Sequence, residues 1–116
     1  MSSPESVEAY TSQVQRRFVK SFLDILILRL LEANPTWGYD IIKETESTYN
    51  FKLRHGALYP MLNELEKKGL VKSRRELKKG RVRKVYEITQ TGREVLQTSQ
   101  DFFKQQTATH YVKRKK

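Results

Sequence analysis

The sequence predicts a mainly α-helical fold that carries a small antiparallel wing of two strands. Residues 55–71 have the spacing of one buried helical stripe, with apolar side chains at steps of three and four: Leu58, Met61, Leu62 and Leu65. The next segment, residues 72–84, holds eight Lys or Arg side chains against a single acid, Glu76. A short amphipathic helix followed at once by a basic ribbon is the order of a winged helix-turn-helix that binds DNA.

The charge of the chain indicates that its binding partner is itself highly charged. Its 116 residues fit one compact domain with extending arms, and its net charge is +10. A charge of this size points to a polyanion, most often nucleic acid. The charge is also uneven, because residues 21–51 contain more acids than bases whereas residues 113–116 are all basic. A basic run can also be a solvated surface without a partner, and this interpretation stays open, above all for the tail.

The absence of cysteine excludes several classes of protein. Disulfide scaffolds, thiolate metal sites and cysteine nucleophiles all need a residue that this chain lacks. A cysteine-free chain fits the reducing cytoplasm, where we expect the protein to reside. The apolar residues 22–31 are about half the length needed to span a bilayer and include Asp24 and Arg29. We therefore expect a buried helix there and no membrane segment.

A catalytic role is not expected either. The chain has two histidines, His55 and His110, and no glycine-rich phosphate cradle. Glu64 and Glu66 are two residues apart and so lie on different faces of a helix. We expect no metal, no cofactor and no enzymatic activity.

Three helices are expected before the amphipathic one. Residues 5–20 form a polar helix with a thin apolar stripe. Residues 21–33 form an apolar central helix, which Pro35 ends because proline disfavours helical geometry in the residue before it. Thr36 can then cap a third helix over residues 37–48. The candidates for burial in that helix are Tyr39, Ile41 and Ile42.

The fourth helix has a clear end and an ambiguous start. It stops at Gly69, after Lys67 and Lys68, whose charges suit a helix C-terminus. Pro60 removes an N–H group and ordinarily breaks a helix interior at a cost of about 3 kcal/mol. From the residues alone, the helix begins near Tyr59.

Two strands and one more helix follow. Residues 71–77 and 82–88 are joined by a turn in which Gly80 is free to take a positive φ. Tyr86 and Ile88 share one face of the second strand and are its expected core contacts. Thr89 or Thr91 then caps a helix that runs to about residue 110, with a sparse apolar stripe.

These elements divide the chain into a winged helix-turn-helix at residues 20–88, flanked by an N-terminal arm at 1–19 and a C-terminal helix at 89–110. A basic tail follows at 111–116. So short a chain has no core against which the apolar residues of the two flanking helices could be buried. We therefore expect these residues to be buried against a second subunit. The predicted dimer contacts are Tyr10, Val14, Phe18, Val95, Leu96, Phe102 and Phe103.

Four stretches of the sequence, in this order and spacing, resemble a known family. They are FLDILILRLLEANPTWGYDIIKE (22–44), GALYPMLNELEKKGLV (56–71), GRVRKVYEIT (80–89) and TGREVL (91–96). Together they cover about two-thirds of the chain and resemble the PadR family of winged-helix transcription regulators, specifically its small members with one C-terminal helix. The chain departs from the family at Arg54 and Ala57, where a small polar helix cap and a threonine are usual. A missing cap costs about 1 kcal/mol of helix-end stability.

The resemblance implies roles for particular residues. The fourth helix would begin before Tyr59, tolerate Pro60 and lie in the major groove of DNA, with the Tyr59 hydroxyl on a phosphate. The residues expected to contact DNA, from this helix, its neighbour and the wing, are Tyr39, Arg54, His55, Gly56, Ala57, Tyr59, Pro60, Asn63, Arg74, Lys78, Lys79, Arg81 and Arg83. Some family members also bind small aromatic effectors between subunits. Phe102 and Phe103 resemble the lining of such a pocket, with Phe18 and Tyr10 as further candidates, although all four can simply be dimer contacts.

The predicted function is a homodimeric regulator, a repressor, that binds an inverted-repeat operator in double-stranded DNA. Phosphate contacts from the wing give affinity but little sequence information, so specificity must come from the helix, from the shape of the minor groove and from the spacing of two half-sites. One alternative is an architectural protein that coats DNA without regard to sequence, which the +10 charge also fits. Another is an interaction module that docks an acidic protein.

Overall fold

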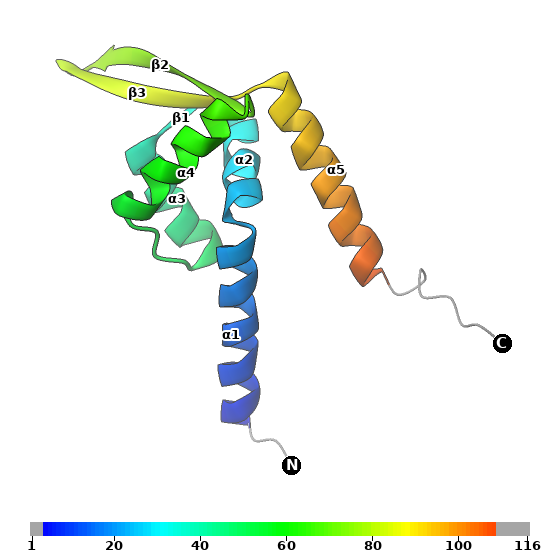
Figure 1. The fold of residues 1–116 in the computed structure, drawn as a ribbon. Helices are drawn as coiled ribbons and strands as arrows, with labels where there is room; N and C mark the ends of the chain where they lie inside the picture. Colours follow the sequence, from blue (N-terminus) through cyan, green and yellow to red (C-terminus); the bar gives the residue numbers. More distant parts are fainter. Residues whose placement is uncertain (1–3, 109–116) are drawn as a thin grey trace.

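The computed structural model describes residues 4–108 of the chain. Two helices, α1 and α5, extend from a central unit that carries a projecting β-hairpin (Figure 1). The elements in chain order are α1 (Pro4–Ser21), α2 (Leu23–Ala33), β1 (Thr36–Trp37), α3 (Gly38–Tyr49), α4 (His55–Lys67), β2 (Val71–Lys78), β3 (Arg81–Ile88) and α5 (Gln90–Thr107). The mainly helical prediction is confirmed. The end of the predicted last helix at residue 110 and the basic tail at 111–116 lie outside the described residues.

Helices α1 and α2 run almost end to end and differ in what they bury. Backbone hydrogen bonds pass through the junction, since the Phe22 N–H donates to the Phe18 carbonyl oxygen at 3.0 Å. Among the described side chains of α1, Val19 alone is buried. In α2 the buried residues are Leu23, Leu26, Ile27, Leu28 and Leu31. The change from polar to apolar sequence therefore marks where the central unit begins.

The sheet has three strands, in the order β1-β3-β2, and all pairs are antiparallel. The predicted hairpin of β2 and β3 is present, but β1 was not expected. Thr36 was assigned to a helix cap, and this is wrong: it pairs with Tyr86 of β3, and its hydroxyl donates to the Asn34 carbonyl oxygen at 2.9 Å. The residue before α3 is Trp37, whose extended backbone continues the pairing and makes no side-chain cap.

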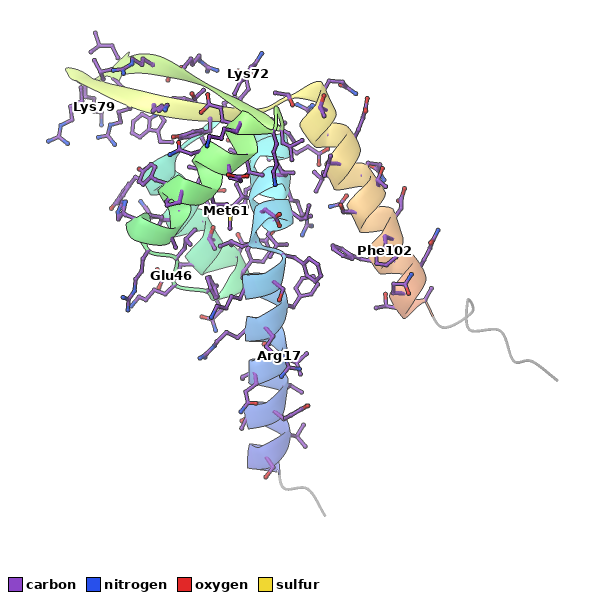
Figure 2. The ribbon with its side chains drawn as sticks, viewed as in Figure 1. Arg17, Glu46, Met61, Lys72, Lys79 and Phe102 are labelled. Atoms are coloured by element: carbon purple, nitrogen blue, oxygen red, sulfur yellow. The ribbon has the colours of Figure 1, made fainter. Side chains whose placement is uncertain are left out.

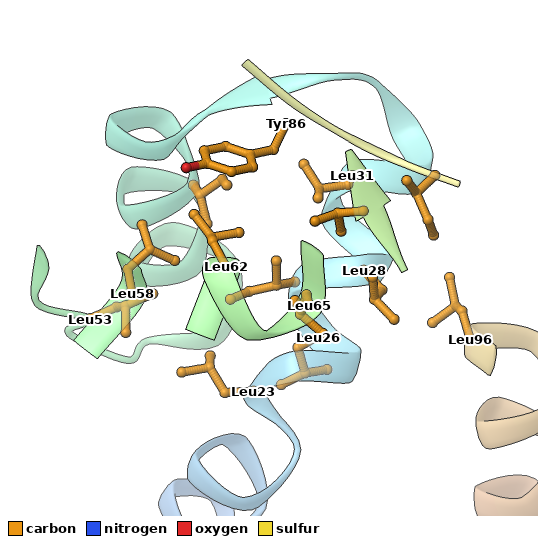
Figure 3. Close-up of a cluster of buried hydrophobic side chains, with 14 of the residues drawn as sticks. Leu23, Leu26, Leu28, Leu31, Leu53, Leu58, Leu62, Leu65, Tyr86 and Leu96 are labelled. Carbon is orange, nitrogen blue, oxygen red and sulfur yellow. The ribbon is translucent and has the colours of Figure 1, made fainter. Parts of the chain in front are cut away.

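The hydrophobic core lies where α2, α3, α4 and the sheet meet, and α5 reaches it at one edge (Figure 3). Leu58, Leu62 and Leu65 point into it, which confirms the predicted stripe of α4. Tyr86 and Ile88 are buried as predicted. The prediction that Tyr39 is a core residue is wrong, because its side chain is 52% exposed at the start of α3.

A tight joint ties α5 to the end of α4. The Thr89 hydroxyl donates to the Gly69 carbonyl oxygen at 2.6 Å and accepts from the Gly92 N–H at 3.0 Å. Thr89 is thus the cap of α5, one of the two predicted, and Gly69 has the positive φ of a helix stop, +75°. Gly92 is packed so closely that a Cβ there would collide with the Leu70 carbonyl oxygen.

The joint also changes the interpretation of the α5 stripe. Leu96 was not expected to be buried within its own chain. This prediction is wrong, because Leu96 is 1% exposed and belongs to the core. Val95 packs partly against the same cluster. Further along α5, Phe102 remains exposed. The first half of α5 is therefore part of the central unit, whereas its second half leaves apolar surface in solvent.

Candidate nucleic-acid interface

Helix α4 begins early enough to present its first turn beyond the core. It starts at His55, with Pro60 inside it, so the start expected from the resemblance is confirmed and the start near Tyr59 is wrong. The turn before Pro60 is held by two N–H groups, of Ala57 and Leu58, that both donate to the Arg54 carbonyl oxygen at 3.0 and 2.9 Å. The Arg54 side chain makes no cap bond, as its departure from the family pattern predicts.

The outward face of α4 carries all the residues that the sequence assigned to DNA contact from this helix. Its exposed residues include Arg54, His55, Gly56, Ala57, Tyr59, Pro60 and Asn63. No atom lies within 4 Å of a Cβ built on Gly56, so packing inside the protomer does not require glycine there. The small residues Gly56 and Ala57 let a large partner approach the helix start closely, where free N–H groups favour a phosphate.

Tyr59 lies over the start of α3 and beside His55. A Cβ on Gly38 would stand 2.9 Å from two ring carbons of Tyr59 and 2.5 Å from its hydroxyl oxygen, so glycine at position 38 leaves space for this ring. On its other side Tyr59 stacks on His55, with ring centroids 5.9 Å apart and an interplanar angle of 17°. Gly38 thus has a physical role, because the space it leaves is occupied by the Tyr59 ring.

An open cleft of about 280 Å³ separates these tyrosines from the wing. Its walls come from the start of α3, from α4 and from β3: Trp37, Gly38, Tyr39, Tyr59, Arg81, Val82, Arg83 and Lys84. Three basic residues of β3 and two tyrosines therefore line one cleft. Cations and hydroxyl groups in this arrangement can bind the phosphate groups of a nucleic-acid backbone.

The tip of the hairpin is a tight, strongly basic turn. Lys79 and Gly80 both have positive φ, +51° and +77°, which is the geometry of the two-residue turns that match the twist of a hairpin. Gly80 therefore adopts the conformation predicted for it. Lys78, Lys79 and Arg81 are all exposed there, and Figure 2 shows Lys79 at the end of the hairpin farthest from α5.

The two faces of the hairpin carry different cations. Successive residues of a strand point to opposite faces, so Ser73, Arg75 and Leu77 share one face. This is the face toward α4, because the Ser73 hydroxyl donates to a carboxylate oxygen of Glu66 at 2.7 Å. Arg75 and Lys84 lie opposite each other on it, on the face that strand parity shares with the buried Tyr86. The Lys84 ammonium group is 5.7 Å from the centroid of the Tyr86 ring.

On the other face, Arg74, Arg83 and Lys78 have partners within the protein. Arg74 forms ion pairs with Glu87 at 2.9 Å and Glu76 at 3.2 Å. Arg83 lies over the Trp37 ring at 4.1 Å from its centroid, and the Lys78 ammonium group is 4.8 Å from the same centroid. The Trp37 ring thus supports the wing through cation–π contacts.

The other residues predicted as dimer contacts or as the lining of an effector pocket lie on the terminal helices. Phe18 and Phe103 contact each other edge to face at 6.0 Å, and Phe22 lies between α1 and α5 at 5.1 and 4.8 Å from these two rings. Phe102 is 6.3 Å from Phe103 and projects from the outer part of α5 (Figure 2). Tyr10 and Val14 lie on the exposed side of α1, at 60% and 41% exposure.

The comparisons with known proteins agree with this geometry. Residues 27–98 match the model of the transcriptional regulator PadR-like family, which spans α2, the sheet, the intervening helices and the joint to α5. The chain belongs to the PadR family. PadR proteins are transcription regulators rather than a class of enzymes, and their DNA-binding winged helix-turn-helix corresponds here to α2–α4 and the hairpin.

Individual relatives point the same way. The transcriptional regulator Rv3488 of Mycobacterium tuberculosis is 33% identical over 81 residues, which is 70% of this chain and 75% of that protein. A PadR family transcription regulator from Clostridium difficile R20291 has a structure with a TM-score of 0.68 at 32% identity, covering 72% of this chain and 88% of the other. A PadR-like transcription factor from Bacteroides fragilis gives a TM-score of 0.70 at 26% identity, covering 86% and 99%.

Two further properties concern the described part of this PadR chain. Within residues 4–108, no helix is both long and apolar enough to cross a membrane. No group of three or more His, Asp or Glu side chains in that part lies close enough together to hold a metal ion.

Proposed function

We propose that this PadR protein is a homodimeric repressor that binds an inverted-repeat operator in double-stranded DNA. In this proposal the N-terminal part of α4 enters the major groove and the wing follows the adjacent backbone. The observation that carries it is the cleft between the wing and the two helices, which is lined by the basic residues Arg81, Arg83 and Lys84 and by Tyr39 and Tyr59. Occupying promoter DNA would block transcription, and such a regulator acts in the cytoplasm, where its DNA is.

The exposed apolar surface of the terminal helices supports the dimer. On α1, Val7, Tyr10, Val14 and Phe18 recur at three- and four-residue steps and are between 41% and 60% exposed. Beside this stripe is an open groove of about 550 Å³ between α1 and the end of α3. A continuous apolar stripe on an isolated helix is costly in water, and a second copy of the chain can cover it through a two-fold axis.

The dimer would set how the two recognition helices are spaced. Half-sites read by a two-fold dimer lie about one helical turn of DNA apart, or a multiple of it. An effector, if one binds, would act at the aromatic cluster of Phe18, Phe22, Phe102 and Phe103, which joins α1 to α5. Shifting these helices changes the separation of the two α4 helices and so the fraction of protein able to bind.

Selection of binding sites from a random duplex library tests the proposal. The selected sequence and a scrambled control are then titrated over a range of salt concentrations. The proposal predicts a two-fold-symmetric site bound at least about a thousandfold more tightly than the control. An equal affinity for both duplexes, falling steeply with salt, would instead support the architectural alternative, which the charge of +10 also fits.

A further inference from the structure

Two aliphatic side chains lie uncovered near the tip of the wing. Leu77 of β2 and Val82 of β3 are directly paired across the hairpin, one pair before the Lys78–Arg81 pair that closes it. They are 72% and 61% exposed, which makes them two of the most exposed large apolar side chains among the described residues. Single exposed aliphatic residues are common, but a facing pair forms a continuous apolar patch on an otherwise basic ribbon.

The patch lies on the side of the wing that also covers α4. Leu77 and Val82 share a face with Ser73 and Tyr86, of which the first hydrogen-bonds to α4 and the second is buried beneath the sheet. The hairpin extends past the helices at this end, so the patch overhangs them (Figure 1). Val82 also lines the cleft that contains Tyr39 and Tyr59. A molecule seated against α4 therefore meets the patch.

Basic residues lie next to the patch in both directions along the hairpin. Arg75 and Lys84 form the neighbouring pair on the same face, and Lys78, Lys79 and Arg81 follow at the tip. The surface that fits this arrangement is apolar at its centre and anionic at both edges. The minor groove of DNA has this chemistry, since its walls are deoxyribose C–H groups and its two rims are phosphates.

The wing is held in place before any partner binds. Its twist is fixed by the two positive-φ residues of the turn, and its far face is fixed by the ion pairs of Arg74 and by the stacking of Arg83 on Trp37. Strand β1 attaches β3 to the start of α3. A preorganised ribbon loses little conformational entropy when it binds, so the gain from covering two aliphatic side chains is retained.

We infer that Leu77 and Val82 form an apolar wedge that enters the minor groove next to the major-groove site of α4 and packs on deoxyribose. This inference rests on the proposed DNA binding but adds a contact that is independent of charge. Apolar side chains that enter the minor groove favour sequences that deform easily there. The wedge therefore adds specificity at base pairs that α4 does not touch.

A polar variant, Leu77→Thr with Val82→Thr, tests the wedge. Threonine keeps the β propensity of both positions, so the hairpin and the thermal midpoint are expected to remain. The matched control is Leu77→Ile with Val82→Ile, which keeps the aliphatic surface. Each protein is titrated against the selected operator over a range of salt concentrations, or against a mixed-sequence duplex if selection enriches none. Hydroxyl-radical footprinting then reports which deoxyriboses are covered.

The expected result is a loss of at least about tenfold in affinity for the threonine pair, about 1.4 kcal/mol, with an unchanged salt slope because no phosphate contact is lost. Protection is lost at one minor-groove patch in each half-site, and the isoleucine pair retains both affinity and protection.

Equal affinity and equal protection for the threonine pair and the parent would overturn the wedge while leaving DNA binding intact. If the parent binds no duplex, the proposed function itself fails. If the threonine pair loses only binding to phosphatidylglycerol vesicles, the patch serves a membrane and the inference is wrong.

Discussion

The central unit and the terminal helices of this protein bury their apolar residues in different ways. From α2 to the first turns of α5, the apolar stripes converge on one core, in which Ile27, Leu28 and Ile41 are fully buried. In α1 and the outer half of α5, side chains of the same kind remain in solvent, with Tyr10 at 60% exposure and Phe102 at 56%. The helices of both regions are regular, so the difference lies in what each helix packs against.

This difference separates two kinds of stability. The central unit needs only its own residues, whereas the terminal helices have surface that only a further contact can cover. The site proposed for DNA lies wholly in the central unit, and the surface proposed for dimerisation lies mostly outside it. Changes in one region should therefore leave the other property largely intact.

The largest expected effect comes from the core of the central unit. Leu62→Ala removes a fully buried side chain of α4, and the cavity should lower the free energy of unfolding by about 2–5 kcal/mol. Denaturant unfolding measures this change. Asn63→Ala, at the adjacent exposed position, is the control and should change stability by less than about 0.5 kcal/mol. Similar losses for both variants would contradict the placement of the core.

A second variant targets α1 without touching the core. Tyr10→Ser with Val14→Ser removes two exposed apolar groups and should raise the dimer dissociation constant by about a hundredfold, or 2.7 kcal/mol. Light scattering over a dilution series measures the mass, and circular dichroism checks that the helices persist. Gln13→Ser, at an exposed position outside the groove between α1 and α3, should leave the mass at two subunits. A double-serine variant that stays dimeric would remove α1 from the interface.

Gly38→Ala tests whether the position of the Tyr59 ring matters for the proposed DNA site in the central unit. The added Cβ displaces the Tyr59 ring, which is partly exposed and can move at little cost in stability. We expect affinity for the selected operator to fall about tenfold, or 1.4 kcal/mol. Tyr59→Ala should cause a similar loss, and combining the two should add little, because both remove one contact. Additive losses in anisotropy titrations would mean that Gly38 acts on DNA by another route.

The smallest expected effect is a pH dependence of stability. Burial raises the pKa of the Tyr86 phenol above its usual value of 10.0, and the charges of Glu66 and Tyr59 raise it further. The unfolded chain then loses this proton first, so the free energy of unfolding falls as pH rises above about 10, by at most about 1.4 kcal/mol per pH unit. Tyr86→Phe should weaken this decline between pH 9 and 10.5 relative to the parent protein. Identical declines in the variant and the parent would contradict the raised pKa.

The sequence predicted the parts of the fold that depend on local pattern. The buried stripe of α4, the positive φ of Gly80 and the Thr89 cap all follow from residue types at short spacing, and all are present. The two-residue strand β1 could not be predicted in the same way. Thr36 and Trp37 are extended because β3, which lies far along the chain, pairs with them.

The errors at Leu96 and Tyr39 have the same cause. Leu96 belongs to a stripe too sparse to predict a core position, but the close approach of Gly92 to Leu70 brings it against the central unit. Tyr39 has the spacing of a core residue, but α3 begins immediately after a strand and its first turn lies at the edge of the cleft. For the site, the basic residues were evident from the sequence. The sequence did not show which of these basic residues form ion pairs within the protein, because the pairing of Arg74 depends on strand register.

The most direct test of the account is the dependence of binding on half-site spacing. Fluorescence anisotropy compares the selected operator with the same duplex carrying five extra base pairs between its half-sites, which is about half a helical turn. Because a dimer with fixed recognition helices reads both half-sites on one side of the duplex, we predict that the insertion lowers affinity at least about a hundredfold, to that of a single half-site. Equal affinity for the two duplexes would contradict a dimer that reads an inverted repeat.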